Sequence, residues 1–89
     1  MSGRMRRTGD IMTSPLDDML LMLDVEQGKY FGLNGVGPRI WELLEQPISE
    51  EELVDTLVAE YEVTREVCAA EVGAFLDGLR QRRLLHDVP

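Results

Sequence analysis

With 89 residues, 44% of them hydrophobic and only 6% aromatic, the chain is long enough for one small domain with a modest core. It has no run of 18 apolar residues, one cysteine and one histidine, which excludes a membrane-spanning helix, an internal disulfide and a structural zinc site. The net charge is −8, and between Thr8 and Leu79 three basic residues stand against sixteen acidic ones. This balance favours basic or neutral partners over nucleic acid, although simple solubility explains it equally well. The first residues lack the apolar core of a signal peptide, so we expect a cytoplasmic protein.

The N-terminal third of the chain predicts strands joined by turns. Residues 1–5 are expected to form a flexible basic arm, and residues 6–12 a first strand. Residues 13–18 are rich in Thr, Ser, Pro and Asp and are typical of a loop. Met19–Val25 is apolar except for Asp24, and its length and flanks suit a buried central strand.

The segment around which the chain is organised is Lys29–Leu33. It follows a short glycine-containing connection and is expected to return antiparallel to the preceding strand as a hairpin. Because side chains alternate along a strand, Phe31 and Leu33 share one face, while Tyr30 and Gly32 share the other. We expect Phe31 and Leu33 to enter the core.

Three helices are expected after this strand. Asn34 can end the strand and cap a first helix over Gly35–Glu45, whose apolar residues form a single stripe. Ser49 is expected to cap the second helix, and Glu52 three residues later completes a capping box.

The third helix is expected over Arg65–Arg83, with Thr64 as its cap. Its core stripe is expected to consist of Cys68, Val72, Phe75, Leu76 and Leu79, with Cys68 buried as a small hydrophobe. Beside this stripe Ala69 and Gly73 lie one turn apart. Such small residues leave a shallow groove along the helix.

Strands followed by three helices, with a tight turn between the last two, place the chain in the α+β class. We predict a winged helix-turn-helix with a three-stranded antiparallel sheet followed by three helices. The predicted single domain covers residues 6–86, and residues 87–89 form a tail.

We find no constellation of residues for catalysis. Cys68 is expected on a buried face and His86 near the end of the chain, so no Cys–His pair is expected. The Glu50–Glu52 run is typical of a solvated helix start, where the helix dipole favours acidic side chains. No glycine-rich phosphate loop is present. We therefore predict no enzyme activity, no metal and no cofactor.

Two binding functions stay open on the residues alone. A DNA-binding helix-turn-helix reads bases with the first half of its third helix, but there Arg65 stands beside two glutamates on an acidic body. Alternatively, an extended peptide can pair with the edge of Lys29–Leu33 and place side chains in the groove beside the third helix. The same pattern also fits an ordinary exposed tyrosine at Tyr30 and an ordinary gap at Gly73.

Longer motifs resemble a known family. The combination of Tyr30–Asn34 (Tyr-Phe-Gly-Leu-Asn) with Ile40–Leu44 (Ile-Trp-Glu-Leu-Leu) resembles the PqqD-like family, also called RiPP recognition elements. The similarity extends from Met19 to Leu85. The Leu33–Gly37 junction is most similar to that of the free-standing precursor-recognition proteins of lasso-peptide biosynthesis.

The resemblance implies a non-catalytic adaptor that binds the leader of a ribosomally made precursor peptide as a strand added to the third strand. Its implied partners are a transglutaminase-like leader peptidase and a lasso cyclase, with no nucleic acid and no membrane. A PqqD-like carrier that presents its peptide to a radical-SAM enzyme is the alternative within the family. At Arg82–Arg83 the chain departs from relatives, which often carry Gly there. The implied peptide-binding residues are Lys29, Tyr30, Phe31, Gly32, Leu33, Ala69, Val72, Gly73, Leu76 and, at the rim, Arg80.

Overall fold

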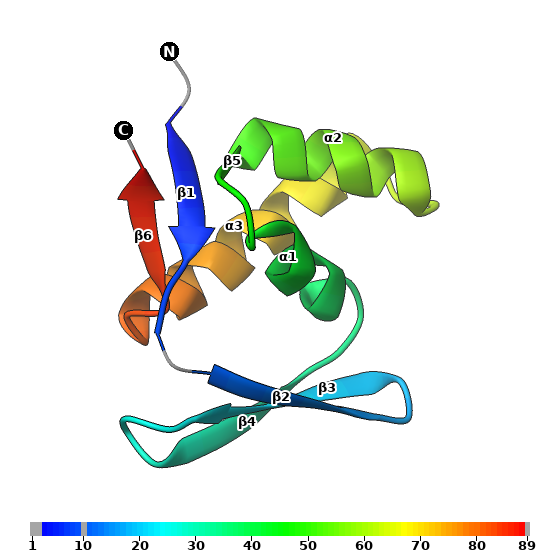
Figure 1. The fold of residues 1–89 in the computed structure, drawn as a ribbon. Coiled ribbons are helices and arrows are strands. Elements are labelled where there is room, and N and C mark those ends of the chain that lie inside the picture. The colour runs from blue at the N-terminus through cyan, green and yellow to red at the C-terminus, as the bar shows by residue number, and fades with distance from the viewer. Residues whose placement is uncertain (1–2, 10, 89) are drawn as a thin grey trace.

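The computed structural model describes residues 3–9 and 11–88, which form three helices and two three-stranded antiparallel sheets (Figure 1). The α+β class is therefore confirmed. No helix in the described part of the chain is long and apolar enough to cross a membrane. In chain order the elements are β1 (Arg4–Arg7), β2 (Ile11–Leu16), β3 (Met19–Asp24), β4 (Lys29–Leu33), α1 (Gly37–Leu43), β5 (Ile48–Ser49), α2 (Glu50–Glu60), α3 (Arg65–Gln81) and β6 (Leu85–Val88).

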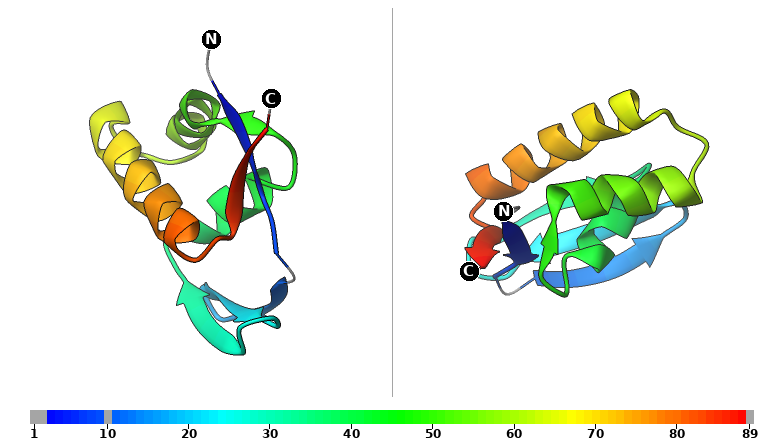
Figure 2. Two further views of the ribbon diagram at one scale, coloured as in Figure 1. Left: turned by 90° about the vertical axis from the view of Figure 1, so that its left-hand side faces the viewer. Right: turned by 90° about the horizontal axis from the view of Figure 1, so that it is seen from above.

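The β2–β3–β4 sheet forms the lower layer of the molecule in Figure 1, and the helices lie above it. The second sheet has the order β5–β1–β6 and joins the two ends of the chain. Met5 of β1 pairs with Ile48 on one side and with Asp87 on the other. The two views of Figure 2 show α2 and α3 packed side by side above the lower sheet.

β3 is the central strand of the lower sheet, and β2 and β4 pair with it along their full lengths. The turns at the ends of β3 contain residues in the left-handed conformation, Asp17 with φ 57° and Gly28 with φ 67°. Glycine and aspartate tolerate this conformation better than most residues. The predicted central strand and the predicted hairpin strand at Lys29–Leu33 are both confirmed.

The core lies between the helices and the inner face of the lower sheet, and Met5 of β1 and Leu85 of β6 extend it to the second sheet. Leu33 is buried there as predicted, but Phe31 is only partly buried and stands at the edge of the core. The predicted burial of Cys68 is confirmed. The largest fully buried side chains are Met22, Ile40, Leu44, Leu53, Leu57, Leu76, Leu84, Val72 and Cys68.

The second and third helices begin where the capping residues predicted. The Ser49 Oγ accepts a hydrogen bond from the Glu52 backbone N–H at 3.1 Å, and the Glu52 carboxylate accepts one from the Ser49 N–H at 3.0 Å. This confirms the capping box. Thr64 caps α3 by accepting from the Val67 N–H at 3.2 Å.

The predicted cap of the first helix is wrong. The N-cap of α1 is Val36, and no side chain caps this helix. Asn34 contributes only its backbone oxygen, which accepts from the Gly37 N–H at 3.0 Å. Gly35, with φ 61°, turns the chain between β4 and α1. This left-handed residue delays the helix, which begins two residues later than predicted.

The predictions for both ends of the chain are also wrong where the structure describes them. Residues 4 and 5 of the expected flexible arm belong to β1, and residues 87 and 88 of the expected tail belong to β6. The two segments form strands because they pair with each other, from Arg4 opposite Val88 to Arg7 opposite Leu85. Residues 1–2 of the arm and residue 89 of the tail lie outside the described residues.

The expected strand at residues 6–12 and loop at residues 13–18 are replaced by β1 and β2. β2 continues through residues 13–16 because each of these residues faces a partner in β3. Pro15 is compatible with this position because β2 is an edge strand. The expected single sheet preceding all helices is therefore also wrong, since β5 and β6 lie between and after the helices.

Candidate functional site

β4 is an edge strand with one free side. Its paired side contacts β3 from Lys29 to Leu33, and among the described residues its other side pairs with no strand. The opposite edge strand, β2, carries Pro15, which has no N–H to offer to an added strand. The unpaired N–H and C=O groups of β4 therefore form the better edge for an extended peptide.

The side chains of β4 alternate between the two faces of the sheet. Leu33 and Phe31 point to the inner face, where the helices lie. Tyr30 is 74% exposed on the outer face. Gly32 shares that face, and a Cβ at this position would stand 2.5 Å from the sulfur of Met19. Only glycine fits beneath Met19 without a shift of that side chain.

A cavity of about 250 Å³ lies between β4 and α3. Phe75 and Leu79 line it from the helix and give it an apolar wall. Gly78 has no side chain, which leaves room on the same helix face. The lining residues are Phe31, Gly32, Leu33, Ala74, Phe75, Gly78, Leu79 and Arg82.

A second cavity, of about 350 Å³, adjoins the first toward the start of β4. Phe31 and Arg82 line both cavities, and the guanidinium carbon of Arg82 stands 4.7 Å from the centre of the Phe31 ring. This is the geometry of a cation–π contact. We call the two cavities together the β4–α3 trough. The remaining residues of the second cavity are Asp24, Gln27, Lys29 and Gln81.

The predicted residues of the strand lie along this trough. Phe31, Gly32 and Leu33 line the apolar cavity, and Lys29 lines the polar one. Tyr30 points away from it, to the outer face. Four of the five predicted strand residues are thus brought together around one elongated space.

The predicted residues of the third helix do not line the trough. Val72 and Leu76 are fully buried, and Ala69 is exposed. Gly73 faces the first residue of α2, and Arg80 contacts β1 through the Met5 sulfur. The structure therefore brings none of these α3 residues to the space beside β4.

Sequence reasoning missed the helix face that does border β4. This face is formed by residues spaced three or four apart, the spacing of one side of a helix, and it lies next to the buried stripe. The spacing was visible in the sequence, but nothing in it showed which side of the stripe would turn toward β4. The α3 face consists of Ala74, Phe75, Gly78, Leu79 and the helix-capping Arg82.

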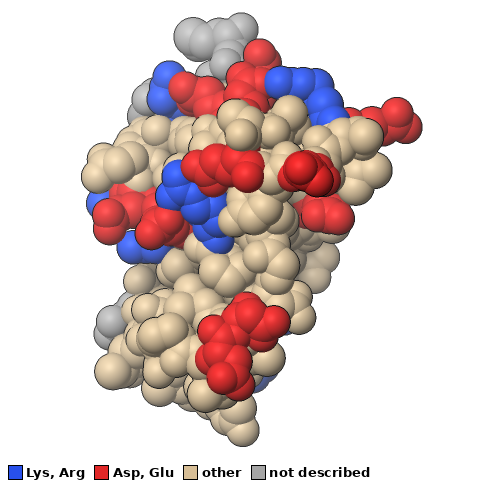
Figure 3. Space-filling view, turned by 90° about the vertical axis from the view of Figure 1, so that its right-hand side faces the viewer, with Lys and Arg blue, Asp and Glu red and all other residues tan. Residues whose placement is uncertain are grey.

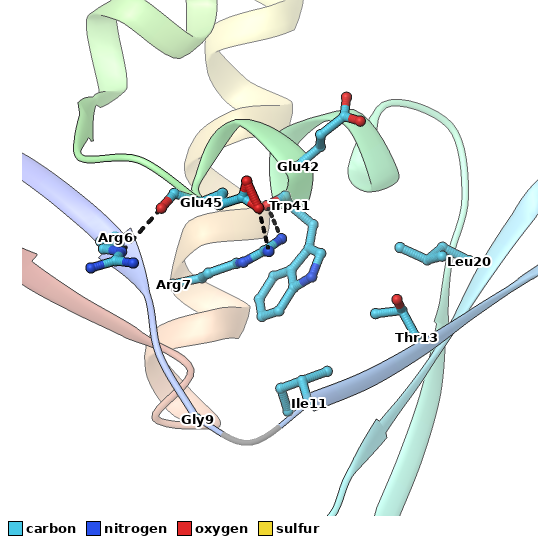
Figure 4. A pocket seen from close by; sticks show the side chains of 9 residues that line it. All are labelled: Arg6, Arg7, Gly9, Ile11, Thr13, Leu20, Trp41, Glu42 and Glu45. Carbon is cyan, nitrogen blue, oxygen red and sulfur yellow. Dashed lines mark hydrogen bonds and ion pairs between the residues drawn. The ribbon is translucent and has the colours of Figure 1, made fainter.

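A third cavity, of about 650 Å³, lies between β1, β2 and α1, and no sequence signal pointed to it (Figure 4). Arg7 stacks on the Trp41 ring at 5.0 Å, donates to the Trp41 carbonyl oxygen at 2.9 Å and pairs with Glu45 at 3.5 Å. Arg6 donates to the Glu45 carbonyl oxygen at 3.0 Å. These contacts join β1 to α1, so the charged groups serve the fold.

Among the described residues outside the trough, the shifted pKa values of Cys68 and Glu60 have structural causes. Burial raises the pKa of the Cys68 thiol, which disfavours a reactive thiolate. Hydrogen bonds from Arg39 lower the pKa of Glu60, which is the signature of an ion pair. No group of three His, Cys, Asp or Glu side chains in the described part of the chain is placed to hold a metal ion. On the face shown in Figure 3 most charged side chains lie over the helices, and the lower part of the molecule is uncharged apart from one acidic cluster.

A small three-helix α+β domain with an open strand edge over an apolar trough is the kind of module that binds a peptide by strand addition. The chain belongs to the PqqD family, because the model of the family described as "Coenzyme PQQ synthesis protein D (PqqD)" matches residues 20–85. This match confirms the resemblance seen in Tyr30–Asn34 and Ile40–Leu44.

Two solved structures are similar to this fold. The first, "TbiB1 in Complex with the TbiA(beta) Leader Peptide", has a TM-score of 0.78 and 37% sequence identity over 91% of this chain and 94% of that one. The second, "Lasso peptide synthetase B1 complexed with the leader peptide", has a TM-score of 0.75 and 25% identity over 96% of this chain and 98% of that one. No curated protein matches the chain.

Proposed function

We propose that this protein binds the leader region of a lasso-type, ribosomally made precursor peptide by adding the leader as a strand to β4. It acts without catalysis, in the cytoplasm, and delivers the precursor to a transglutaminase-like leader peptidase and a lasso cyclase. The observation that carries this proposal is the open edge of β4 beside an apolar trough. Two similar structures, both solved with a leader peptide, support it.

In the proposed complex, main-chain hydrogen bonds to Lys29–Leu33 supply affinity, and alternate leader side chains enter the trough. The helix wall that they meet is formed by Phe75, Gly78 and Leu79. Val72 and Leu76, expected at the wall, support it from the core. This arrangement places the specificity of the site in the apolar cavity and its general affinity in the strand edge.

We also propose that the fold is a winged helix-turn-helix. The packing of α2 against α3 after a short turn supports it. DNA binding is the less favoured use of such a fold here. Arg65, at the start of α3, already pairs with Asp55, and the chain carries a net charge of −8.

A PqqD-like carrier for a radical-SAM enzyme is the second candidate, and the family match favours it. Both candidates use the same strand edge and differ in the enzyme that takes the peptide. The enzyme encoded beside this protein separates them. A transglutaminase-like peptidase supports the lasso assignment, and a radical-SAM enzyme supports the carrier.

The direct test is a fluorescence-polarisation titration with the labelled leader peptide of the neighbouring precursor gene. A scrambled leader and a random DNA duplex serve as controls. We expect saturable binding of the leader only. Binding of the duplex but not of the leader would overturn the proposal.

Strand addition is tested by N-methylation of successive backbone amides of the leader, which removes main-chain donors and leaves the side chains intact. Because an added strand directs every second N–H toward its neighbour, we expect weaker binding at alternate positions. Equal binding by all methylated peptides would contradict pairing with β4.

A further inference from the structure

Basic side chains that form no ion pair with the described residues lie at one end of the trough. Nine lysines and arginines occur in the chain, and within residues 3–9 and 11–88 five of them form ion pairs with carboxylates. Two of the other four, Lys29 and Arg82, line the polar cavity, and Arg83 follows in sequence. The five paired residues are Arg4, Arg7, Arg39, Arg65 and Arg80.

Arg82 is held in place yet keeps most of its donors. Its Nη1 donates to the Gly78 carbonyl oxygen at 3.3 Å, and its guanidinium lies over the Phe31 ring. A guanidinium carries five N–H donors, so these contacts orient the group and leave several donors available. The helix dipole explains a basic residue at the end of α3, but it does not explain Lys29 on the neighbouring strand.

The polar cavity contains one carboxylate of its own. Asp24 is 6% exposed, accepts a hydrogen bond from the Gln27 backbone N–H at 3.2 Å and is the register partner of Lys29. It forms no ion pair among the described residues. Two basic groups and one largely buried acidic group therefore line this cavity, although the chain as a whole is acidic.

The spacing of the two cavities is fixed by the pleat of β4. Leu33 lines the apolar cavity and Lys29 lines the polar one, on the same face of the strand and four residues apart. A strand added to this edge also directs every second side chain inward. An inward side chain beside Leu33 and another beside Lys29 are then four residues apart in the peptide.

We propose that the trough selects a peptide in which an Asp or Glu lies four residues from an apolar anchor, with its carboxylate bound by Arg82 and Lys29. This inference rests on the proposed function and adds a sequence requirement to it. The planar fork of arginine suits a carboxylate because it can donate two parallel hydrogen bonds. The acidic chain as a whole favours basic or neutral partners, whereas this end of the trough favours an acidic side chain.

The test compares wild-type protein with Arg82→Gln and Lys29→Gln by fluorescence polarisation. The probes are the labelled leader peptide and a series in which each Asp or Glu is replaced in turn by Asn or Gln. Arg6→Gln is the matched control, because it removes the same charge from a residue that lies at the third cavity. Thermal melting verifies that each variant is folded. Because Lys29 lies on β4 and Arg82 at the end of α3, Lys29→Gln still tests the inference if Arg82→Gln fails to fold.

We expect Arg82→Gln to weaken binding of the native leader about tenfold, the size expected for losing a hydrogen bond to a charged group. For one peptide of the series, in which the bound carboxylate has become an amide, the wild-type protein and Arg82→Gln should bind with equal affinity. Arg6→Gln should bind the native leader as tightly as the wild-type protein does. If both trough variants bind like wild type, or lose the same affinity for every peptide, the inference falls and the proposed function stands. If the wild-type protein binds no leader, both fall together.

Discussion

Phe75 of α3 lies directly against Gly37 of α1: a Cβ on that glycine would stand 3.2 Å from the Phe75 ring and 3.3 Å from the Cβ of Leu33. The glycine therefore allows the first helix to meet both the strand edge and the apolar wall of the trough. The Cβ of Leu33 is attached directly to the backbone of β4 and has little freedom to move. A larger residue at position 37 must displace the Phe75 ring instead.

Replacing Gly37 with Ala should destabilise the fold by about 1–2 kcal/mol, because the added methyl overpacks a filled contact. The displaced Phe75 ring should also narrow the trough and weaken leader binding. Urea unfolding and the leader titration measure the two effects. Gly3→Ala is the control, since no atom lies within 4 Å of a Cβ at that position. Unchanged stability of Gly37→Ala would show that the contact relaxes freely.

Substitutions at two glycines of α3 test which side of the helix contacts the leader. Gly73 belongs to the side expected from the sequence, and Gly78 belongs to the side that borders β4 in the structure. Gly78 lines the apolar cavity, whereas Gly73 faces α2, where a Cβ would stand 3.7 Å from the Glu50 carboxylate. Gly78→Leu should fill the trough and weaken leader binding at least about tenfold, without lowering the melting temperature, because glycine is a poor helix former. Gly73→Leu should leave affinity unchanged. The opposite result in the leader titration would favour the wall expected from sequence.

The pairing strand could be predicted from sequence because its signals are local. Lys29–Leu33 alternates, follows a glycine turn and precedes an apolar helical stripe, and each signal depends on neighbouring residues. The capping box at Ser49 and Glu52 is local in the same way. The bounds of β1 and the existence of β6 could not be predicted, because their partners are distant in sequence: the two strands pair with each other, and β1 also pairs with β5.

The α3 side of the site could be predicted only in part. The periodicity of α3 gave the buried positions Cys68, Val72 and Leu76 correctly. The wall of the trough depends on the angle at which α3 crosses the lower sheet, and no residue of α3 encodes that angle alone. Phe75, expected in the core, is only partly buried: it packs against the core and also lines the cavity.

The Cys68 thiol should be unreactive in the folded protein. It is 2% exposed, and burial raises its pKa, so both access and thiolate fraction are reduced. We expect slow labelling by a thiol reagent such as DTNB at pH 8 and complete labelling in urea. Labelling in the native state should proceed only through opening of the fold. Rapid labelling without urea would place Cys68 at an accessible surface.

The fold should lose stability in acid partly through Glu60. Arg39 of α1 donates two hydrogen bonds to the Glu60 carboxylate of α2, at 2.9 and 2.8 Å, and lowers its pKa below the ordinary value of 4.5. Because the pKa is lower in the folded state, this contribution is fully present above that value. It is lost as the pH falls through the lowered pKa of the folded protein.

Glu60→Gln should therefore reduce the melting temperature at pH 7 and make it less sensitive to acid as the pH falls below 4.5. Both residues are partly exposed, so the effect should be modest and should shrink in high salt. Melting curves at several pH values measure it. Glu62→Gln, which removes an exposed carboxylate that forms no ion pair among the described residues, is the control. Equal pH profiles for the two variants would show that the link between α1 and α2 adds nothing to acid stability.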